Sequence, residues 1–226
     1  ITSIDQYREL IDEINKNNGA TSLKFREKLS RIAFTETAYY DTVISNYFNK
    51  KTNTHLPKKK IFSANLIEKL RYGENPHQEG AIYTSLKNPV LTKLNGKQLS
   101  YNNYLDIFAA LQISSTFPKN IGSVIVKHGN PCGVSIHKDN TKSFMLAHKC
   151  DPISSFGGIV SCNFKITKKL SLELNKIFFE VIIANGFEKD ALKILKSKKN
   201  LRLIDASSYQ ENEQLTFNSL NDSIII

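Results

Sequence analysis

The 226-residue sequence contains few cysteines, and their spacing excludes the usual roles of clustered thiols. Cys132, Cys150 and Cys162 lie in three different segments and form no Cys-x-x-Cys pair. An odd number of scattered cysteines in a chain of this length does not make a disulfide framework. The same spacing lacks the ligand pattern of a structural zinc site. We therefore interpret all three residues as reduced thiols.

Long apolar runs are missing as well. No stretch reaches the roughly 20 apolar residues that span a bilayer, and the opening residues ITSIDQYREL are typical of a helix rather than a signal peptide. The sequence contains no internal repeat, zinc finger, RNP motif or leucine zipper. We expect a soluble, cytoplasmic protein that binds neither a membrane nor nucleic acid.

The charge of the chain is strongly basic. There are 31 Lys and Arg against 21 Asp and Glu, which gives a formal net charge of +10. Lysines gather at residues 56–60, 167–169 and 196–200. Such a surface attracts phosphorylated or polyanionic small ligands, although a solvated lysine-rich face explains the same pattern.

Helical patterns occupy the first fifty residues. Ser3 is placed to cap a helix that ends at Asn18-Gly19, and a longer pattern follows Thr21-Ser22. The lysine-rich stretch 51–60 has one proline and little to bury, so we interpret it as a linker. The start at Ile1 and the apolar ending NDSIII, which reads as a strand, predict a piece of a longer protein.

After the linker, short β-branched runs alternate with amphipathic segments. We predict strands at 123–128, 157–163, 180–185 and 201–205, and helices at 103–117, 141–149, 167–178 and 188–198. Asn102 or Asn103 is the expected N-cap of the first of these helices. This alternation is typical of a layered α/β domain. Ligands bind such sheets where loops leave the carboxyl ends of strands, and residues 128–133 are predicted to form such a loop.

The stretch VIVKHGNPCGVS offers three candidates for chemistry. Cys132 could act as a nucleophile beside His128, and its Pro-Cys pair resembles the zinc-deaminase signature His-x-Glu followed by Pro-Cys-x-x-Cys. Asn130 stands where that signature needs glutamate, and Ser135 where it needs the second cysteine, so the metal site is absent. Lys127 and His128 are better candidates, as a cation and a base at a strand end. A structural role for the pair is the alternative.

Two further turns carry candidates for ligand contact. In LRYGENPHQ, Arg71 offers a fork of donors for phosphate or carboxylate, Tyr72 a ring face, and His77 an imidazole after an Asn-Pro turn. In DPISSFGGIVS, Ser155 and the backbone of Gly157 could approach a ligand closely. Each stretch is also compatible with an ordinary turn.

Five segments, taken in order, resemble one family. They are LRYGENPHQ, LNGKQLSYNNYLD, VKHGNPCGV, CDPISSFGGIV and EVIIANGFEKDALKILKSKKNLRLI. Together they are similar to the bifunctional purine-biosynthesis enzymes AICAR transformylase/IMP cyclohydrolase. The resemblance covers essentially the whole chain, and the agreement of five motifs in sequence and order makes it specific.

The resemblance implies a domain organisation. Residues 1–50 correspond to the C-terminal helices of the cyclohydrolase domain and a connector, and residues 51–60 to a linker. Residues 61–226 correspond to a truncated transformylase domain, namely its first cytidine-deaminase-like layered α/β subdomain. One departure is Asn185, which stands where the family motif Ile-Ala-Pro-Gly has proline. We expect it to change loop stiffness rather than chemistry.

The resemblance also implies a reaction: formyl transfer from 10-formyltetrahydrofolate, a co-substrate, to AICAR, giving FAICAR. It further implies that no metal takes part and that the enzyme is a homodimer. His128 matches the catalytic histidine that moves a proton from the attacking amine, and Lys127 matches the lysine that stabilises the transition state. The other matched residues are expected to bind substrate: Arg71, Tyr72, His77, Asn130, Ser155, Phe156, Gly157 and Glu180.

The family enzymes also close FAICAR to IMP, but their cyclohydrolase core and most of their folate site match no part of this sequence. We therefore expect the isolated chain to bind AICAR weakly and to turn over little or none. A non-catalytic nucleotide-binding fragment is the alternative function.

Overall fold

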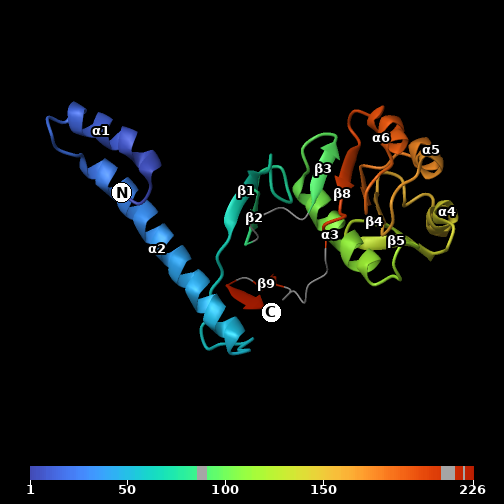
Figure 1. Ribbon diagram of the computed structural model, residues 1–226, viewed down its shortest axis with the longest axis horizontal. Helices are drawn as coiled ribbons and strands as arrows, with labels where there is room; N and C mark the ends of the chain where they lie inside the picture. Colours follow the sequence, from blue (N-terminus) through green and yellow to red (C-terminus); the bar gives the residue numbers. More distant parts are fainter. Residues whose placement is uncertain (86–90, 210–216, 221) are drawn as a thin grey trace. The chain divides into compact units, whose positions relative to one another are not determined.

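The computed structural model describes residues 1–85, 91–209, 217–220 and 222–226 of the chain (Figure 1). The chain divides into two units, Ile1–Asn65 and Leu66–Ile226. Among the described residues, no helix is both long and apolar enough to cross a membrane. The stretch 51–60 follows the last helix of the first unit. A domain boundary at this stretch stays a prediction.

The first unit is helical. Its elements are the 3₁₀-helix η1 (Ile4–Gln6) and the α-helices α1 (Tyr7–Lys16) and α2 (Leu23–Lys51). The hydroxyls of Ser3 and Ser22 each accept a hydrogen bond from a backbone amide in the first turn that follows, as expected of N-caps. After α1 the backbone turns left-handed at Asn18 and Gly19, with φ of 51° and 89°. Both helices predicted here are confirmed.

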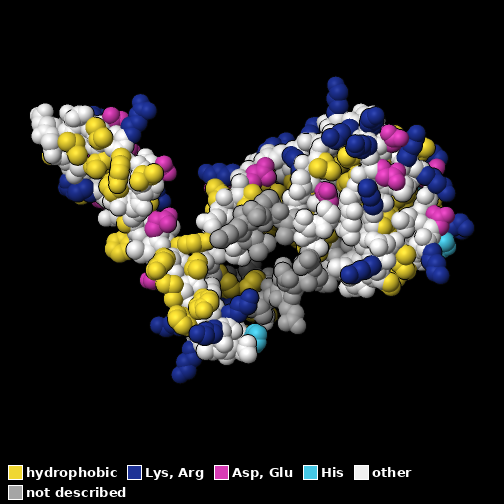
Figure 2. All heavy atoms as spheres, in the orientation of Figure 1, with side chains coloured by type: hydrophobic (Ala, Val, Ile, Leu, Met, Phe, Trp, Pro, Cys, Tyr) yellow, Lys and Arg dark blue, Asp and Glu magenta, His cyan; other side chains and the backbone are white. Residues whose placement is uncertain are grey.

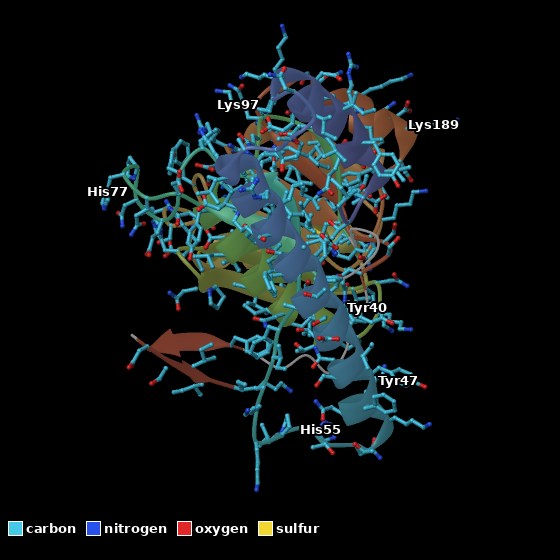
Figure 3. All side chains as sticks on the ribbon, turned by 90° about the vertical axis from the view of Figure 1, so that its left-hand side faces the viewer. Tyr40, Tyr47, His55, His77, Lys97 and Lys189 are labelled. Carbon is cyan, nitrogen blue, oxygen red and sulfur yellow. The ribbon has the colours of Figure 1, made fainter. Side chains whose placement is uncertain are left out.

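The long helix α2 leaves apolar side chains exposed. Phe34, Tyr40, Tyr47 and Phe48 are each more than half exposed, and Tyr40 and Tyr47 project from the helix in Figure 3. Figure 2 shows apolar side chains gathered along the surface of this unit. Most helices in proteins owe their stability to packing of an apolar face. This face of α2 therefore remains available for packing against other protein surface.

The second unit is built around a six-stranded sheet with strand order β3-β8-β7-β6-β4-β5. The strands are β3 (Thr92–Asn95), β4 (Gly122–Lys127), β5 (Asn130–Ile136), β6 (Ile159–Cys162), β7 (Val181–Ala184) and β8 (Arg202–Asp205). Strands β6, β7 and β8 are parallel, whereas β4 runs antiparallel to both of its neighbours and β3 runs antiparallel to β8.

Helices cover both faces of this sheet. One face packs against α3 (Tyr101–Ser115), and the other against α4 (Asn140–Cys150), α5 (Lys168–Lys176) and α6 (Lys189–Lys196) (Figure 1). Side chains alternate along β7: Val181 and Ile183 join the α3 side of the core, and Ile182 and Ala184 join the other. All four are fully buried. The predicted layered α/β class is confirmed.

Two small two-stranded sheets complete the second unit: β1 (Asn65–Lys69) with β2 (Ala81–Thr84), and β9 (Asn218–Leu220) with β10 (Ser223–Ile225). Strand β10 confirms that the apolar ending of the sequence is extended. The sequence analysis did not predict β1, β2, β3, β5 or β9. These strands are short or carry turn-forming residues, so they lack a continuous apolar run.

The predicted loop at 128–133 is wrong. His128 and Gly129 form a two-residue turn, and β5 begins at Asn130, which pairs with Lys127. The register then shifts, because Ile125 pairs with Gly133 and Val126 with Pro131, which leaves Cys132 as the extra residue of a β-bulge. The sequence analysis interpreted Pro131 and the two glycines as a loop, but the stretch forms a tight hairpin.

The predicted N-cap of α3 is also wrong. Ser100, rather than Asn102 or Asn103, caps the helix: its hydroxyl accepts a hydrogen bond from the Asn103 amide at 3.1 Å. The Asn103 side chain in turn accepts one from the Ser100 amide, also at 3.1 Å, which completes a capping box.

We expect Ser100→Ala to lower the free energy of unfolding by about 1 kcal/mol, because the amides of the first turn of α3 lose their acceptor. Urea unfolding followed by circular dichroism measures this change. The control is Ser115→Ala, since Ser115 lies in the last turn of the same helix and its hydroxyl donates a hydrogen bond to the Gln112 carbonyl. Equal stabilities of the two variants would contradict the capping role of Ser100.

Candidate active site at one edge of the sheet

The direction of β4 determines which side chains meet at one edge of the sheet. Val126, near the carboxyl end of β4, pairs with Ile159 at the start of β6, which pairs with Val181 at the start of β7. Val181 pairs in turn with Arg202 at the start of β8. The turn after β4 therefore lies at the same edge as the segments that precede β6, β7 and β8. We call this edge the site edge.

The predicted site residues at this edge come from both ends of strands. Among the predicted residues, Lys127 and His128 do leave the carboxyl end of β4. Gly157 and Glu180, however, precede the amino ends of β6 and β7. The antiparallel direction of β4 brings these two groups together, whereas an all-parallel sheet would place them at opposite edges.

The turn after β4 presents a cation and an imidazole. Lys127 is half-buried, and its ammonium donates a hydrogen bond to the Phe156 carbonyl at 2.8 Å. His128 is exposed and has a φ of 53°, a left-handed conformation that is uncommon for residues other than glycine. Strain of this kind is concentrated at functional sites. The Asn130 side chain donates to the His128 carbonyl at 3.0 Å, so this predicted site residue braces the turn.

The segment before β6 supplies an aromatic surface and a tight backbone turn. Phe156 is 61% exposed, and its ring lies 5.2 Å from that of Phe178, centroid to centroid. Gly157 has a φ of 75°, and its amide donates to the Phe178 carbonyl at 2.8 Å. Ser155 is fully buried, and its hydroxyl donates to the Asp151 carbonyl at 2.6 Å. The Ser155 hydroxyl thus forms its hydrogen bond inside its own segment. Contact between Ser155 and a substrate stays a prediction.

Glu180 lies at the centre of a polar cluster before β7. Its carboxylate accepts a hydrogen bond from the Asn103 side chain at 2.9 Å and forms an ion pair with Arg202 at 3.5 Å. The side chain of Arg202 is only 11% exposed, and its Nε donates to the Gln98 carbonyl at 3.2 Å. Burial lowers the pKa of Arg202. The Glu180 carboxylate raises this pKa, whereas the nearby Arg71 guanidinium lowers it further. Guanidinium remains charged in proteins, so Arg202 is a largely buried cation.

A cavity of about 590 Å³ opens beside this cluster. Its lining carries the cations Arg71, Lys97, Lys198, Lys199 and Arg202. Glu180 is the one acidic residue among the described lining residues. An excess of cations in a cavity of this size suits an anionic small molecule.

Of the predicted residues in LRYGENPHQ, two lie close to the cavity and one does not. Arg71 lines the cavity, and its guanidinium stacks 5.5 Å from the centre of the Tyr72 ring. His77 is exposed on the loop before β2, points outward in Figure 3 and does not line the cavity. Its role as a substrate ligand stays a prediction.

The sequence analysis missed several residues of the site edge. They are Lys97, Asn103, Asp106, Lys198, Lys199 and Arg202. All six lie inside the segments quoted for the family resemblance, which was the available signal. Lys198 and Lys199 belong to the basic run 196–200, for which the sequence analysis left both anionic ligands and a solvated face open.

The cysteines and possible metal ligands add no chemistry to the site edge. All three cysteines are free thiols, as expected. Burial raises the pKa of Cys132, and it raises that of Cys162 to about 12, so neither is an activated thiolate. Among the described residues, no group of three His, Cys, Asp or Glu side chains is arranged to hold a metal ion.

A second cavity, of about 620 Å³, lies at the opposite edge of the sheet, where β6, β7 and β8 end. Asn185 lines it and donates a hydrogen bond to the Asn163 carbonyl at 3.0 Å. A proline at position 185 could not make this bond, because it has no side-chain amide. The departure from the family motif therefore changes the contacts of this loop.

The structure defines a class by its fold: a layered α/β domain that carries a lysine, a histidine and a cationic cavity at one edge of its sheet. The family model described as AICARFT/IMPCHase bienzyme matches residues 1–226, and the chain belongs to this family. The resemblance found in the sequence is therefore confirmed.

Curated relatives agree with this assignment. The chain is 41% identical over 228 residues to the bifunctional purine biosynthesis protein PurH of Leptospira biflexa, covering 100% of this chain and 44% of that protein. It is 40% identical over 225 residues to PurH of Listeria welshimeri (97% and 44% covered) and 44% identical over 212 residues to PurH of Prochlorococcus marinus (88% and 40% covered). The chain thus spans less than half the length of these relatives.

Similarity to solved structures is lower. RibD of Acinetobacter baumannii, form 1, is 14% identical and aligns with a TM-score of 0.33 over 44% of this chain and 35% of that one. Such a likeness does not test the cytidine-deaminase-like detail of the fold, which stays a prediction.

Proposed function

We propose that this chain contributes the lysine, the histidine and part of the nucleotide site to an enzyme of purine biosynthesis. The enzyme transfers a formyl group from 10-formyltetrahydrofolate to AICAR, giving FAICAR, and the whole enzyme also closes FAICAR to IMP. The observation that carries the proposal is the placement of Lys127 and His128 at the same edge as Glu180 and the cationic cavity.

In the proposed mechanism, the 5-amino group of AICAR attacks the formyl carbon, and a new carbon–nitrogen bond forms. His128 accepts the proton that this amine loses. The Lys127 ammonium stabilises the negative charge that develops on the formyl oxygen. The bond between the formyl carbon and N10 of the folate then breaks, and N10 takes up a proton as tetrahydrofolate leaves. In this mechanism Lys127 supplies the positive charge, and no metal is required.

The cationic cavity supports binding of the phosphate of AICAR. Arg202 is a largely buried cation that is already oriented by the Gln98 carbonyl and Glu180. Pre-oriented guanidinium groups bind phosphate through paired hydrogen bonds. Arg71, whose side chain is stacked on Tyr72, adds a second guanidinium to the same cavity.

We also propose that the site is completed by protein surface beyond this chain. The imidazole of His128 and the ring of Phe156 are exposed, so they leave one side of the reacting groups open to water. The remainder of the enzyme, or the second subunit of a homodimer, would close it and provide most of the folate site. A cytoplasmic location is part of the same proposal.

The proposal is tested with two proteins: the 226-residue chain and the polypeptide encoded by the complete open reading frame. Calorimetry measures AICAR binding, and absorbance measures formation of tetrahydrofolate. We expect the complete polypeptide to form FAICAR, and the 226-residue chain to bind AICAR weakly with little or no turnover. If the complete polypeptide binds AICAR without turnover, the chain belongs to a non-catalytic nucleotide-binding protein and the proposal fails.

Replacing Arg202 with methionine is expected to raise the AICAR dissociation constant about tenfold, which is about 1.4 kcal/mol. The substitution keeps an apolar stem of similar length but removes the guanidinium from the cavity. Calorimetry on the complete polypeptide measures the change, with the exposed Arg8→Met as a matched control. Equal affinity of wild type and Arg202→Met would exclude this cavity as the phosphate site.

A further inference from the structure

The turn that carries His128 needs support from outside the hairpin. His128 and Gly129 both have positive φ, 53° and 74°, as two-residue hairpin turns require. Such turns usually carry asparagine and glycine, because other side chains are strained in the left-handed region. Any relaxation of the turn would move the imidazole of His128.

A carboxylate on another element restrains this turn. Asp106, on α3, accepts a hydrogen bond from the Gly129 amide at 2.6 Å through its Oδ1. Among the described residues, this bond alone ties the backbone of His128 or Gly129 to an element outside the β4–β5 hairpin. The other bond to the turn, from Asn130 to the His128 carbonyl, belongs to the hairpin and moves with it.

Asp106 is well placed to act as a fixed point. It is half-buried, and the next residue of α3, Ile107, is fully buried, as is Ala110 one turn further on. Both pack in the core against β4 residues such as Val126. Helix α3, which carries the carboxylate, therefore packs on β4, and the carboxylate restrains the turn at the end of β4. This contact fixes the turn relative to the sheet.

We propose that Asp106 is a positioning residue: its carboxylate oxygen holds the Gly129 amide and thereby sets the place of the His128 imidazole for proton transfer. This inference rests on the proposed function of His128. Asp106 acts through hydrogen-bond acceptance by one oxygen rather than through its charge. A misplacement of about 1 Å costs on the order of 100-fold in rate for groups that must meet a reacting atom.

The test uses Asp106→Ala and Asp106→Asn in the polypeptide encoded by the complete open reading frame. Alanine removes the acceptor, so we expect kcat for formyl transfer to fall roughly 10- to 100-fold, with the KM for AICAR within about twofold of wild type. Asparagine keeps an acceptor oxygen in the same position, so its kcat should stay within about threefold of wild type and its pH profile should keep its shape.

The matched control is Asp205→Ala. The Asp205 carboxylate also accepts a backbone amide, that of Ser207, at 2.9 Å, but it does so at the opposite edge of the sheet. We expect this variant to keep wild-type kcat. If Asp106→Asn loses as much activity as Asp106→Ala, or changes the pH profile, the charge of Asp106 is what matters and the inference is overturned. It is also overturned if Asp106→Ala keeps wild-type kcat.

Amide hydrogen exchange in the 226-residue chain gives a readout that does not depend on activity. We expect exchange at Gly129 to be slow in wild type and in Asp106→Asn, and at least about tenfold faster in Asp106→Ala, where the amide loses its acceptor. Unchanged exchange at Gly129 would overturn the inference. If exchange responds as expected but the complete polypeptide shows no formyl transfer that depends on His128, the proposed function fails while the restraint on the turn stands.

Discussion

Replacing His128 with alanine in the complete polypeptide is expected to reduce kcat for formyl transfer by a factor of about 10² to 10⁴, the usual contribution of a positioned general base. The AICAR dissociation constant should change no more than about threefold, because the cationic cavity is untouched. Stopped-flow or steady-state absorbance gives kcat, and calorimetry gives the dissociation constant. The exposed His55→Ala serves as a control in the first unit.

His128→Asn separates loss of the imidazole from loss of the turn. Asparagine tolerates the left-handed conformation that His128 adopts at φ 53°, so the hairpin should keep its geometry. We expect this variant to be as inactive as His128→Ala. Wild-type turnover in either variant would remove His128 from the proposed mechanism.

Replacing Gly133 with alanine is expected to destabilise the second unit by about 3 kcal/mol, the upper part of the range for overpacking. A Cβ at Gly133 would lie 1.9 Å from the Ala147 carbonyl oxygen. This oxygen belongs to the backbone of α4, whose neighbouring side chain Phe144 is fully buried, so the helix cannot easily move away. Urea unfolding of the 226-residue chain, followed by circular dichroism, measures the loss.

The matched control is Gly129→Ala in the same hairpin. A Cβ there meets nothing within 4 Å, so its cost is the left-handed backbone alone, at φ 74°. That cost is about 1 kcal/mol. Equal unfolding midpoints for Gly133→Ala and wild type would show that β5 and α4 are not packed as closely as described.

The sequence predicts the centre of the sheet better than its margins. Strands β6 and β7 are fully buried and β4 and β8 are buried except at terminal residues, and all four were found because continuous β-branched runs identify buried strands. Strand β5 contains Pro131 and Gly133, which indicate a turn unless the close approach of α4 is known. Strand β3 is polar and only partly buried, so it has no periodic apolar signal. The pairing of β3 with β8 depends on contacts between segments that are far apart in the sequence.

The candidate site, like the sheet, could be predicted from the sequence only in part. Lys127, His128 and Glu180 lie in motifs that the sequence analysis singled out, and the structure places them at one edge. Contacts between distant segments could not be predicted, because they depend on strand direction. The bond from the Gly129 amide to Asp106 and the ion pair between Glu180 and Arg202 are of this kind.

The antiparallel direction of β4 has a consequence for the electrostatic field that the backbone produces at the site edge. Because β6, β7 and β8 begin at this edge, the helices that precede them, α4, α5 and α6, all end there. Their final carbonyls carry partial negative charge. Nucleotide sites at strand carboxyl ends instead use the positive amino termini of helices to hold phosphate.

Side chains must therefore offset the field of these three helix ends before any anion can bind. Lys198 illustrates this, because its ammonium donates to the Ile177 carbonyl at the end of α5, at 2.8 Å, while also lining the cavity. Part of the excess positive charge of the chain thus neutralises the dipoles of its own peptide groups. Lys198 therefore has a structural role, which follows from strand direction, beside its place in the cavity lining.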